Sequence, residues 1–379
     1  MTTPCPGRRA ARAISRFAAL PALAALAGAF PELARAQSDS VQIYGFIKEN
    51  VEQVRLSGNG RTASVSRLSN DLSVLGFRGR ESLGGGLEAF FQIETNLRMD
   101  GTGTSQIGDR NTGVGLRSPW GQILMGQWEM PLRFVSVYKV DPFTAGIFAS
   151  NSIMGNGFTT GANGAAPESF DRRQRNLVQY STPHWGGVSA RLALSMPEDR
   201  TPTTNPIAWS GLLSYEDKSW YVAWGHEYHG DYFYSGSRDH ADRLGVVYAF
   251  GGTRLRGAYE RLSYEPAPGQ SVRRDAWQVA ATHAIGAHEF RASYTAGGNA
   301  HGNSKAAIGG IGLPGTDSGA WQVALGYGYT LSKRTELWAA WTRLVNHATA
   351  RYNLSGNSVP GLRPGDSATG VGLGITHKF

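Results

Sequence analysis

The sequence predicts an all-β fold, a transmembrane β-barrel of sixteen antiparallel strands. Most of the chain beyond residue 40 alternates apolar and polar side chains with a period of two, as strands with one wet and one apolar face do. Short turns alternate with longer, polar, glycine-rich connections. The alternation continues through 368–379 as far as Phe379, so we expect this segment to be a paired strand that closes the barrel.

Residues 1–36 are expected to be a secretory signal peptide. An arginine-rich start is followed by the apolar run 17–30 and by the small-residue cleavage pattern Ala34-Arg35-Ala36. The alternative is an N-terminal membrane anchor, but a spanning helix needs about 20 apolar residues and this run is shorter. The exported chain is then 37–379, and it has no cysteine because Cys5 leaves with the signal.

Charge argues against a nucleic-acid partner. Five arginines and one glutamate leave with the signal, so the 37 basic and 29 acidic side chains of the whole chain become 32 and 28. The remaining lysines and arginines are scattered and form no basic patch, so we expect no nucleic-acid binding. No later segment has 18 consecutive apolar residues, so we expect no helical membrane span; a soluble all-β protein and a transmembrane β-barrel both fit this composition.

The strands can be counted by their turns. Alternation is clearest in 41–51, 87–97, 320–330 and 336–345. Tight turns are predicted at 83–86, 119–121, 185–187, 216–218, 251–252, 286–287 and 332–334. Seven such turns join fourteen strands, and an opening strand at 41–55 with the closing strand at 368–379 completes sixteen.

Longer polar connections are predicted at 196–206, 227–241, 297–318 and 347–367. Short turns at one end and long loops at the other are the layout of an outer-membrane barrel. An immunoglobulin-like sandwich or a propeller is the alternative, but neither explains this asymmetry together with a final aromatic strand. We therefore place Phe379 in the aromatic girdle at the periplasmic end.

Four segments carry a family resemblance. They are "SVLGFRGRESLGGGLEAFFQIE" (73–94), "DRNTGVGLRSPWGQILMGQ" (109–127), "RQRNLVQYSTPHWGGV" (173–188) and "GITHKF" (374–379). In this order they resemble the general trimeric outer-membrane porins of Gram-negative bacteria, particularly those of the β-proteobacterial type. Gln127 departs from the pattern, because the family usually has arginine there.

The resemblance implies a sixteen-stranded homotrimer that lets small hydrophilic solutes and ions diffuse passively across the outer membrane. Its third long loop, here 129–171, would fold into the lumen and narrow it, and a loop of this length normally has a function. The resemblance also implies contacts with outer-membrane lipids and lipopolysaccharide, and insertion by machinery that reads the terminal aromatic residue, here Phe379. This loop has fewer acidic residues than such loops often carry.

Two criteria together predict the residues of the pore: the face of the strand on which a residue falls, given by the alternation, and the family motifs. Charges are expected on the lumen face, which is wet. The basic wall residues are Lys48, Arg78, Arg110 and Arg173, the wall acid is Glu94, and the loop acid is Asp141. Opposite charges across the constriction would favour polar solutes, and the excess of arginine predicts a weak anion preference. The alternative for each residue is a rim or loop position without a role in permeation.

Enzyme and metal signatures are weak. "GIGLPG" (310–315) matches a G-x-G-x-x-G pattern but lies in a proline-containing loop, not between a strand and a helix. His226 and His229 have no local carboxylate–histidine set. We therefore expect no catalytic residues, no metal and no cofactor. A solute-selective channel of the same fold is the alternative function, and an enzyme or adhesin on a narrow barrel is the alternative class.

Overall fold

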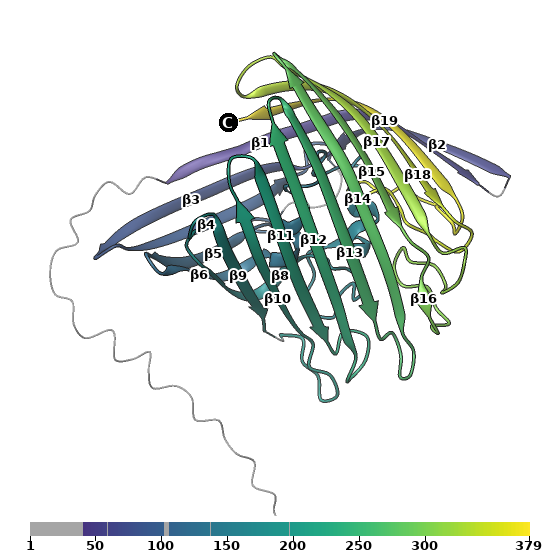
Figure 1. Cartoon of the computed structure of the whole chain (residues 1–379), viewed down its shortest axis with the longest axis horizontal. Coiled ribbons are helices and arrows are strands. Elements are labelled where there is room, and N and C mark those ends of the chain that lie inside the picture. The colour runs from purple at the N-terminus through teal and green to yellow at the C-terminus, as the bar shows by residue number, and fades with distance from the viewer. Residues whose placement is uncertain (1–40, 59, 102–105, 137, 197) are drawn as a thin grey trace, which may run out of the picture. The chain divides into compact units, whose positions relative to one another are not determined.

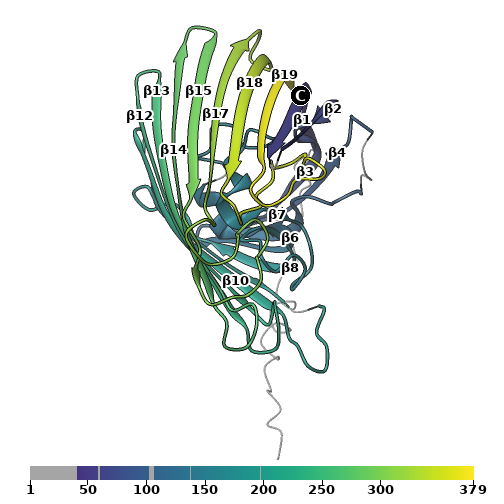
Figure 2. The same ribbon diagram turned by 90° about the vertical axis from the view of Figure 1, so that its right-hand side faces the viewer.

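The computed structural model describes residues 41–58, 60–101, 106–136, 138–196 and 198–379. The predicted signal peptide, residues 1–36, lies outside the described residues. The described chain forms a closed barrel of 16 antiparallel strands (Figures 1 and 2), as the sequence predicts. In this part of the chain no helix is long and apolar enough to cross a membrane.

The barrel strands follow one another around the ring in chain order. They are β1 (Gln42–Gly58), β3 (Ser73–Gly84), β4 (Leu87–Leu97), β5 (Thr112–Ser118), β6 (Gly121–Glu129), β8 (Asp171–Ser181), β9 (Val188–Ser195), β10 (Ile207–Glu216), β11 (Trp220–Gly230), β12 (Arg238–Phe250), β13 (Thr253–Tyr264), β14 (Val272–Ile285), β15 (His288–Gly297), β17 (Ala320–Thr330), β18 (Thr335–Asn346) and β19 (Ser367–Lys378). Two further strands extend this sheet. β2 (Arg61–Asn70) continues the line of β3 along β1, and β16 (His301–Gly302) pairs with the end of β14.

The ring closes between its first and last strands. β1 and β19 are antiparallel from Phe46 opposite Lys378 to Ser57 opposite Ser367. Beyond the ladder, the Gly45 amide donates to the Phe379 carbonyl at 3.2 Å, and the Phe379 amide donates to the Gly45 carbonyl at 3.0 Å. A side chain at Gly45 would collide with the Val74 carbonyl oxygen, 2.1 Å from its Cβ, and with the Phe379 ring, whose Cζ would lie at 2.8 Å. The glycine therefore lets the terminal ring pack against the first strand.

The connections have the predicted asymmetry. Each predicted short turn joins two consecutive strands, for example 85–86 between β3 and β4 and 251–252 between β12 and β13. One long loop is shorter than predicted, because 227–241 is mostly strand and only 231–237 connects β11 to β12. Polar residues stand on both faces of the strand ends here, with Glu227 inward and Tyr228 outward, and this hides the alternation.

Side-chain parity separates the two faces of the barrel. On β11 the exposed residues Trp220, Val222 and Trp224 alternate with the buried residues Tyr221 and Ala223. Exposed aromatic rings also gather near the short turns. They include Trp120, Trp185, Trp220, Phe250, Tyr329 and Phe379. An apolar outer band with such aromatic girdles is typical of an outer-membrane barrel.

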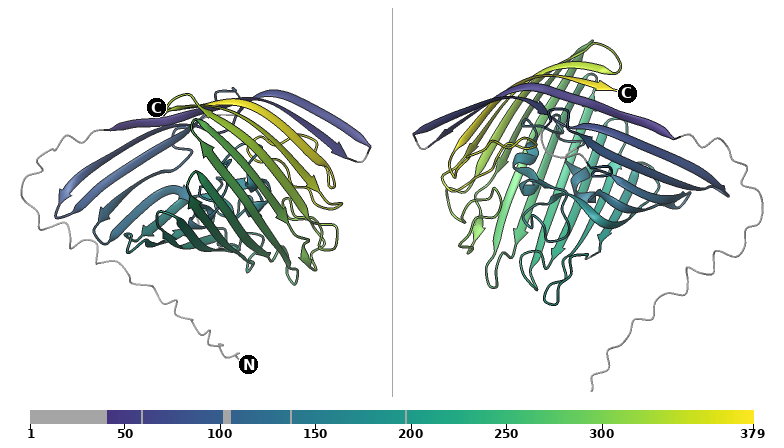
Figure 3. Two further views of the ribbon diagram at one scale, coloured as in Figure 1. Left: turned by 45° about the horizontal axis from the view of Figure 1, so that its top comes forward. Right: turned by 180° about the vertical axis from the view of Figure 1, so that it is seen from behind.

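The third long connection, 130–170, lies on the concave side of the strands (Figures 2 and 3). It contains three 3-10 helices and one strand. They are η2 (Pro131–Val135), η3 (Ser150–Ser152), η4 (Met154–Asn156) and β7 (Phe158–Thr159), which pairs in parallel with β8. Inward-facing glycines leave room for the loop. A Cβ added at Gly370 would lie 2.5 Å from Ile147, and one added at Gly326 would lie 2.7 Å from Phe143.

An apolar core fills part of the barrel interior. Ile147, Phe148 and Ile153 of the third connection are buried against inward-facing strand residues. Tyr352 and Leu354, from the connection between β18 and β19, belong to the same core. The third connection is therefore packed against one side of the barrel.

Deletion of Phe379 should impair assembly. It removes two backbone hydrogen bonds, each worth about 1 kcal/mol net, and the ring that packs on Gly45. We expect a lower yield of heat-modifiable folded protein after refolding in detergent, measured by gel mobility before and after boiling. Phe379→Tyr keeps an aromatic ring and serves as the control. An unchanged yield after the deletion would refute the closing role of this residue.

Candidate functional site

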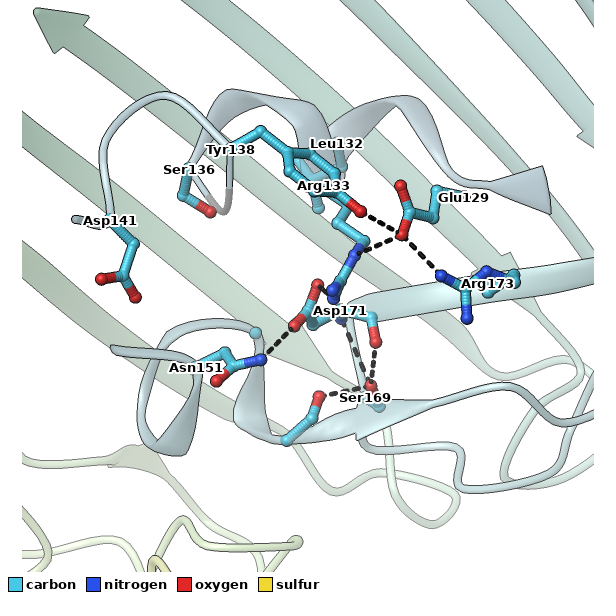
Figure 4. A network of polar contacts seen from close by, with 12 residues as sticks. Glu129, Leu132, Arg133, Ser136, Tyr138, Asp141, Asn151, Ser169, Asp171 and Arg173 are labelled. Carbon is cyan, nitrogen blue, oxygen red and sulfur yellow. Dashed lines mark hydrogen bonds and ion pairs between the residues drawn. The ribbon is translucent and has the colours of Figure 1, made fainter. Parts of the chain in front are cut away.

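A buried ionic network holds the start of the third connection to the barrel wall (Figure 4). Glu129, at the end of β6, accepts a hydrogen bond from Arg173 of β8 at 2.7 Å and one from Arg133 of η2 at 3.3 Å. The Tyr138 hydroxyl donates to the same oxygen. The Glu129 and Arg173 side chains are each 1% exposed. A charge-assisted network of this kind fixes geometry, because each buried charge needs its partners.

Asp171, the first residue of β8, extends this network. Its carboxylate pairs with Arg133 and accepts a hydrogen bond from Asn151 of η3 at 3.0 Å. Its backbone amide donates to the Ser169 hydroxyl at 3.2 Å. The two ends of the connection, together with η3, thus meet at one carboxylate. We call Glu129, Arg133, Asp171 and Arg173 the first clamp.

A second network holds the middle of the connection to β12, β13 and β14. Glu260 of β13 accepts hydrogen bonds from the Gly155 amide at 2.9 Å and from Arg243 of β12 at 2.8 Å. Arg274 of β14 lies 3.2 Å from the same carboxylate and donates to the Ile153 carbonyl at 2.9 Å. We call Glu260, Arg243 and Arg274 the second clamp. All three side chains are buried, so the middle of the loop is tied to the wall by charges that water does not screen.

Three of the predicted pore residues lie close together. Arg110 is 3.6 Å from Glu94 and donates to the Asn96 side chain at 3.0 Å. Arg173 donates to the Asn111 side chain at 2.8 Å and belongs to the first clamp. Both arginines are buried, at 7% and 1% exposure. Each is therefore held beside a carboxylate.

The other two predicted basic residues lie on the inner face of the first strands. Lys48 is 3.4 Å from Asp71, and its ammonium lies 5.1 Å from the Trp338 ring centre. Arg78 is exposed, donates to the Gln42 side chain at 2.9 Å and stacks over Tyr44 at 4.7 Å. Neither forms an ion pair with the third connection among the described residues.

The predicted loop acid, Asp141, is enclosed by its own loop. It accepts hydrogen bonds from the Ser150 amide and hydroxyl, both at 2.6 Å, and from the Phe143 amide at 2.9 Å. Burial raises the pKa of the Asp141 carboxyl, and these hydrogen bonds lower it in part. Among the described residues, Asp141 forms no ion pair. Its contacts are those of a residue that shapes the loop.

Sequence reasoning missed several charged residues of the interior. Glu129, Arg133 and Asp171 lie at strand ends or in the loop, where no alternation marks the inner face. Arg117 and Arg191 do lie on alternating strands, beside the outward-facing Leu116 and Leu192. The parity rule applied to β5 and β9 would have found these two arginines.

Open space remains along the inner side of β3 to β9. One cavity of about 540 Å³ is lined by residues that include Arg78, Arg117 and Trp128. A second, of about 700 Å³, shares Arg117 and Trp128 with it and adds Phe134 and Arg191. The two cavities are therefore adjacent, and they lie on the side of the barrel that the third connection leaves open.

The two histidines considered as metal ligands do not share a site, because they face opposite sides of β11. His226 faces outward and is 2.9 Å from Asp242. His229 faces inward and is stacked between Phe170 and Tyr232, each at 4.2 Å. Among the described residues there is no cluster of histidine, cysteine and carboxylate side chains that could hold a metal ion.

Comparison with known families gives a match over most of the chain. A family model described as Gram-negative porin matches residues 22–349. Outer membrane porin protein 32 of Delftia acidovorans is 28% identical over 370 residues, which cover 94% of this chain and 98% of that protein. Major outer membrane protein P.IB of Neisseria gonorrhoeae is 28% identical over 193 residues, 49% of this chain and 51% of that protein.

Solved structures give the same fold. The anion-selective porin from Comamonas acidovorans superimposes with a TM-score of 0.72 at 25% identity, covering 90% of this chain and 100% of that one. A trimeric form of OmpT from Vibrio cholerae superimposes with a TM-score of 0.62 at 15% identity, covering 90% and 99%.

Removal of Glu129 should destabilise the barrel far more than removal of an exposed acid at the end of β10. Glu129→Ala leaves the buried Arg173 guanidinium without its carboxylate, which should cost about 3–5 kcal/mol of unfolding free energy. Glu216→Ala is the matched control. It breaks the Lys139–Glu216 pair, whose side chains are 42% and 44% exposed, and should cost about 0–1 kcal/mol. Denaturant unfolding in detergent micelles measures both, and equal losses would contradict the clamp.

Proposed function

The chain belongs to the Gram-negative porin family, and from this premise we propose that its water-filled outer-membrane channel passes small hydrophilic solutes with a weak preference for anions. The channel itself follows from the family and from the closed barrel. The anion preference is carried by one observation above all. The larger cavity of the open side presents Arg117 and Arg191, and its lining contains no aspartate or glutamate among the described residues.

The relatives support this preference. The solved porin from Comamonas acidovorans is described as anion-selective, and it covers almost the whole of this chain. A solvated charge acts over roughly 8 Å at physiological salt, so only charges beside the passage should count. Arg78, Arg117 and Arg191 border it, whereas Glu129, Asp171 and Glu260 are neutralised in the clamps.

We also propose that the loop 129–171 constricts the passage. Its contacts with β11 to β19 and its two clamps support this role, since they keep it against one wall. In this proposal Arg110, Arg173 and Glu94 border the constriction together with Lys48 and Arg78. Asp141 shapes the loop and contributes little to the field, because its oxygens accept hydrogen bonds from the loop itself.

The assembly is proposed to be a homotrimer, on the basis of the family and of a related fold solved as a trimer. Outer-membrane lipids and lipopolysaccharide are proposed to contact the apolar outer face. The barrel-insertion machinery is proposed to read Phe379. The channel is proposed to have no enzymatic activity, in keeping with a family of channels.

The wild-type channel should let chloride pass more readily than potassium. Substitution of both Arg110 and Arg173 by glutamine should move the reversal potential in a potassium chloride gradient toward cation preference, because Glu94 loses its arginine partner and Glu129 keeps only Arg133 of its two. Conductance should rise as the passage widens. Both quantities can be measured on single channels in planar bilayers.

Arg343→Gln provides the control for net charge, because Arg343 is exposed on the strand face opposite to the buried Thr342 and Leu344. It should leave the reversal potential unchanged. If the double variant behaves like this control, Arg110 and Arg173 do not border the constriction.

Cysteine labelling should distinguish the third loop from a surface loop. The segment 37–379 contains no cysteine, so single substitutions give a clean signal. Ser152→Cys, beside Asn156, should react slowly with a bulky impermeant maleimide on intact cells, because Ser152 is 5% exposed. Lys305→Cys, near Gly302, should react rapidly. Similar rates at the two positions would contradict the proposal that the loop 129–171 constricts the passage.

A further inference from the structure

The larger cavity combines two guanidinium groups with aromatic rings. It measures about 700 Å³ and is bordered by β5, β6, β8, β9 and the start of the third connection. Arg117 and Arg191 supply positive charge, and Trp128 and Phe134 supply rings. We call it the arginine–aromatic cavity. Its volume lies within the range of about 300–1,000 Å³ that is usual for small-molecule sites.

Arg191 is held in place without an ion pair among the described residues. Its guanidinium lies 4.2 Å from the Phe134 ring centre, so the ring supports one face of the group. Stacking uses the face of a guanidinium and leaves its N–H edges for a carboxylate. Arg191 is therefore a positioned cation with donors that the described protein does not pair with an acid.

Arg117 completes the positive side of the cavity. It lies over the Phe90 ring at 5.2 Å and donates to Glu88 at 2.6 Å and to Gln122 at 3.1 Å. These contacts orient it and neutralise part of its charge. Arg191 is for this reason the stronger of the two anion contacts.

Trp128 supplies the apolar side. It is half-buried, packs on one side against the buried cluster that includes Met130 and Leu177, and also lines the cavity. An indole ring in this position can stack with a flat apolar group. A simple inorganic anion would use the arginines and leave this surface wet.

We propose that the arginine–aromatic cavity is a binding site for aromatic monocarboxylates, in which Arg191 pairs the carboxylate and Trp128 contacts the ring. This proposal rests on the proposed channel function and names a solute class for it. Binding is weak enough for the solute to leave toward either side, because the cavity is open to water. The site therefore binds the solute transiently while it crosses the channel.

The test is block of single-channel chloride current by added carboxylates. Benzoate, cyclohexanecarboxylate and acetate share the charge and differ in the ring. Half-block by benzoate is expected at a concentration at least about tenfold lower than that by acetate, because burial of a ring adds to the ion pair. Cyclohexanecarboxylate is expected between the two, since it is apolar but cannot stack.

Variants assign the block to the cavity. Arg191→Gln should raise the half-blocking benzoate concentration about tenfold, and Trp128→Leu about threefold. Arg254→Gln is the matched control. Arg254 lies on β13, on the same inward face as Ala258 and Glu260, and does not line the cavity. It removes the same charge from the lumen and should leave benzoate block within about twofold of wild type.

The outcomes distinguish failure of the proposed channel function from failure of the proposed binding site. If wild-type protein carries no ohmic current, the channel function itself is overturned. If it conducts normally but benzoate blocks no better than acetate, or if Arg191→Gln and Arg254→Gln weaken block equally, only the aromatic carboxylate site is overturned. Benzoate block in wild type that Trp128→Leu weakens supports the site even if Arg191→Gln does not fold.

Discussion

The interior of this barrel depends on buried arginine–carboxylate pairs. Glu129 joins Arg173 of the wall to Arg133 of the third connection, and Glu260 joins the middle of the loop to Arg243 and Arg274. A buried charge is costly unless it is paired and hydrogen-bonded, so neither clamp can open without leaving charges unpaired. The clamps therefore fix the loop against one wall, and the space along β3 to β9 remains for solutes.

This arrangement also explains which charges can act on a permeating ion. The acids of the clamps are neutralised by arginines within the protein. Arg191 has no acidic partner among the described residues, and Arg78 is exposed beside a glutamine. The passage thus keeps a modest positive excess, although residues 37–379 carry only 32 basic against 28 acidic side chains. The positions of the charged side chains decide the preference for anions, and the net charge of the chain contributes only weakly.

The sequence predicted the barrel well because the cause of the pattern is local. Each strand has a wet and an apolar side, so alternation marks the strands and short turns separate them. The clamps could not be found in this way. Gly155 and Glu260 are 105 residues apart, and the loop has no period that would show which side chains face the wall. Asp141 illustrates the limit, since its acidic character was evident but its partners Ser150 and Phe143 were not.

If the clamps hold the loop to one wall, anions should be enriched in the passage along β3 to β9. A crystal structure of the protein in bromide, with the anion located by anomalous scattering, shows where anions gather. We expect bromide beside Arg191 and Arg117, and a loop that keeps its position from Arg133 to Asp171. Bromide gathered instead along β13 to β19, or a loop released from Glu129 and Glu260, would contradict this expectation.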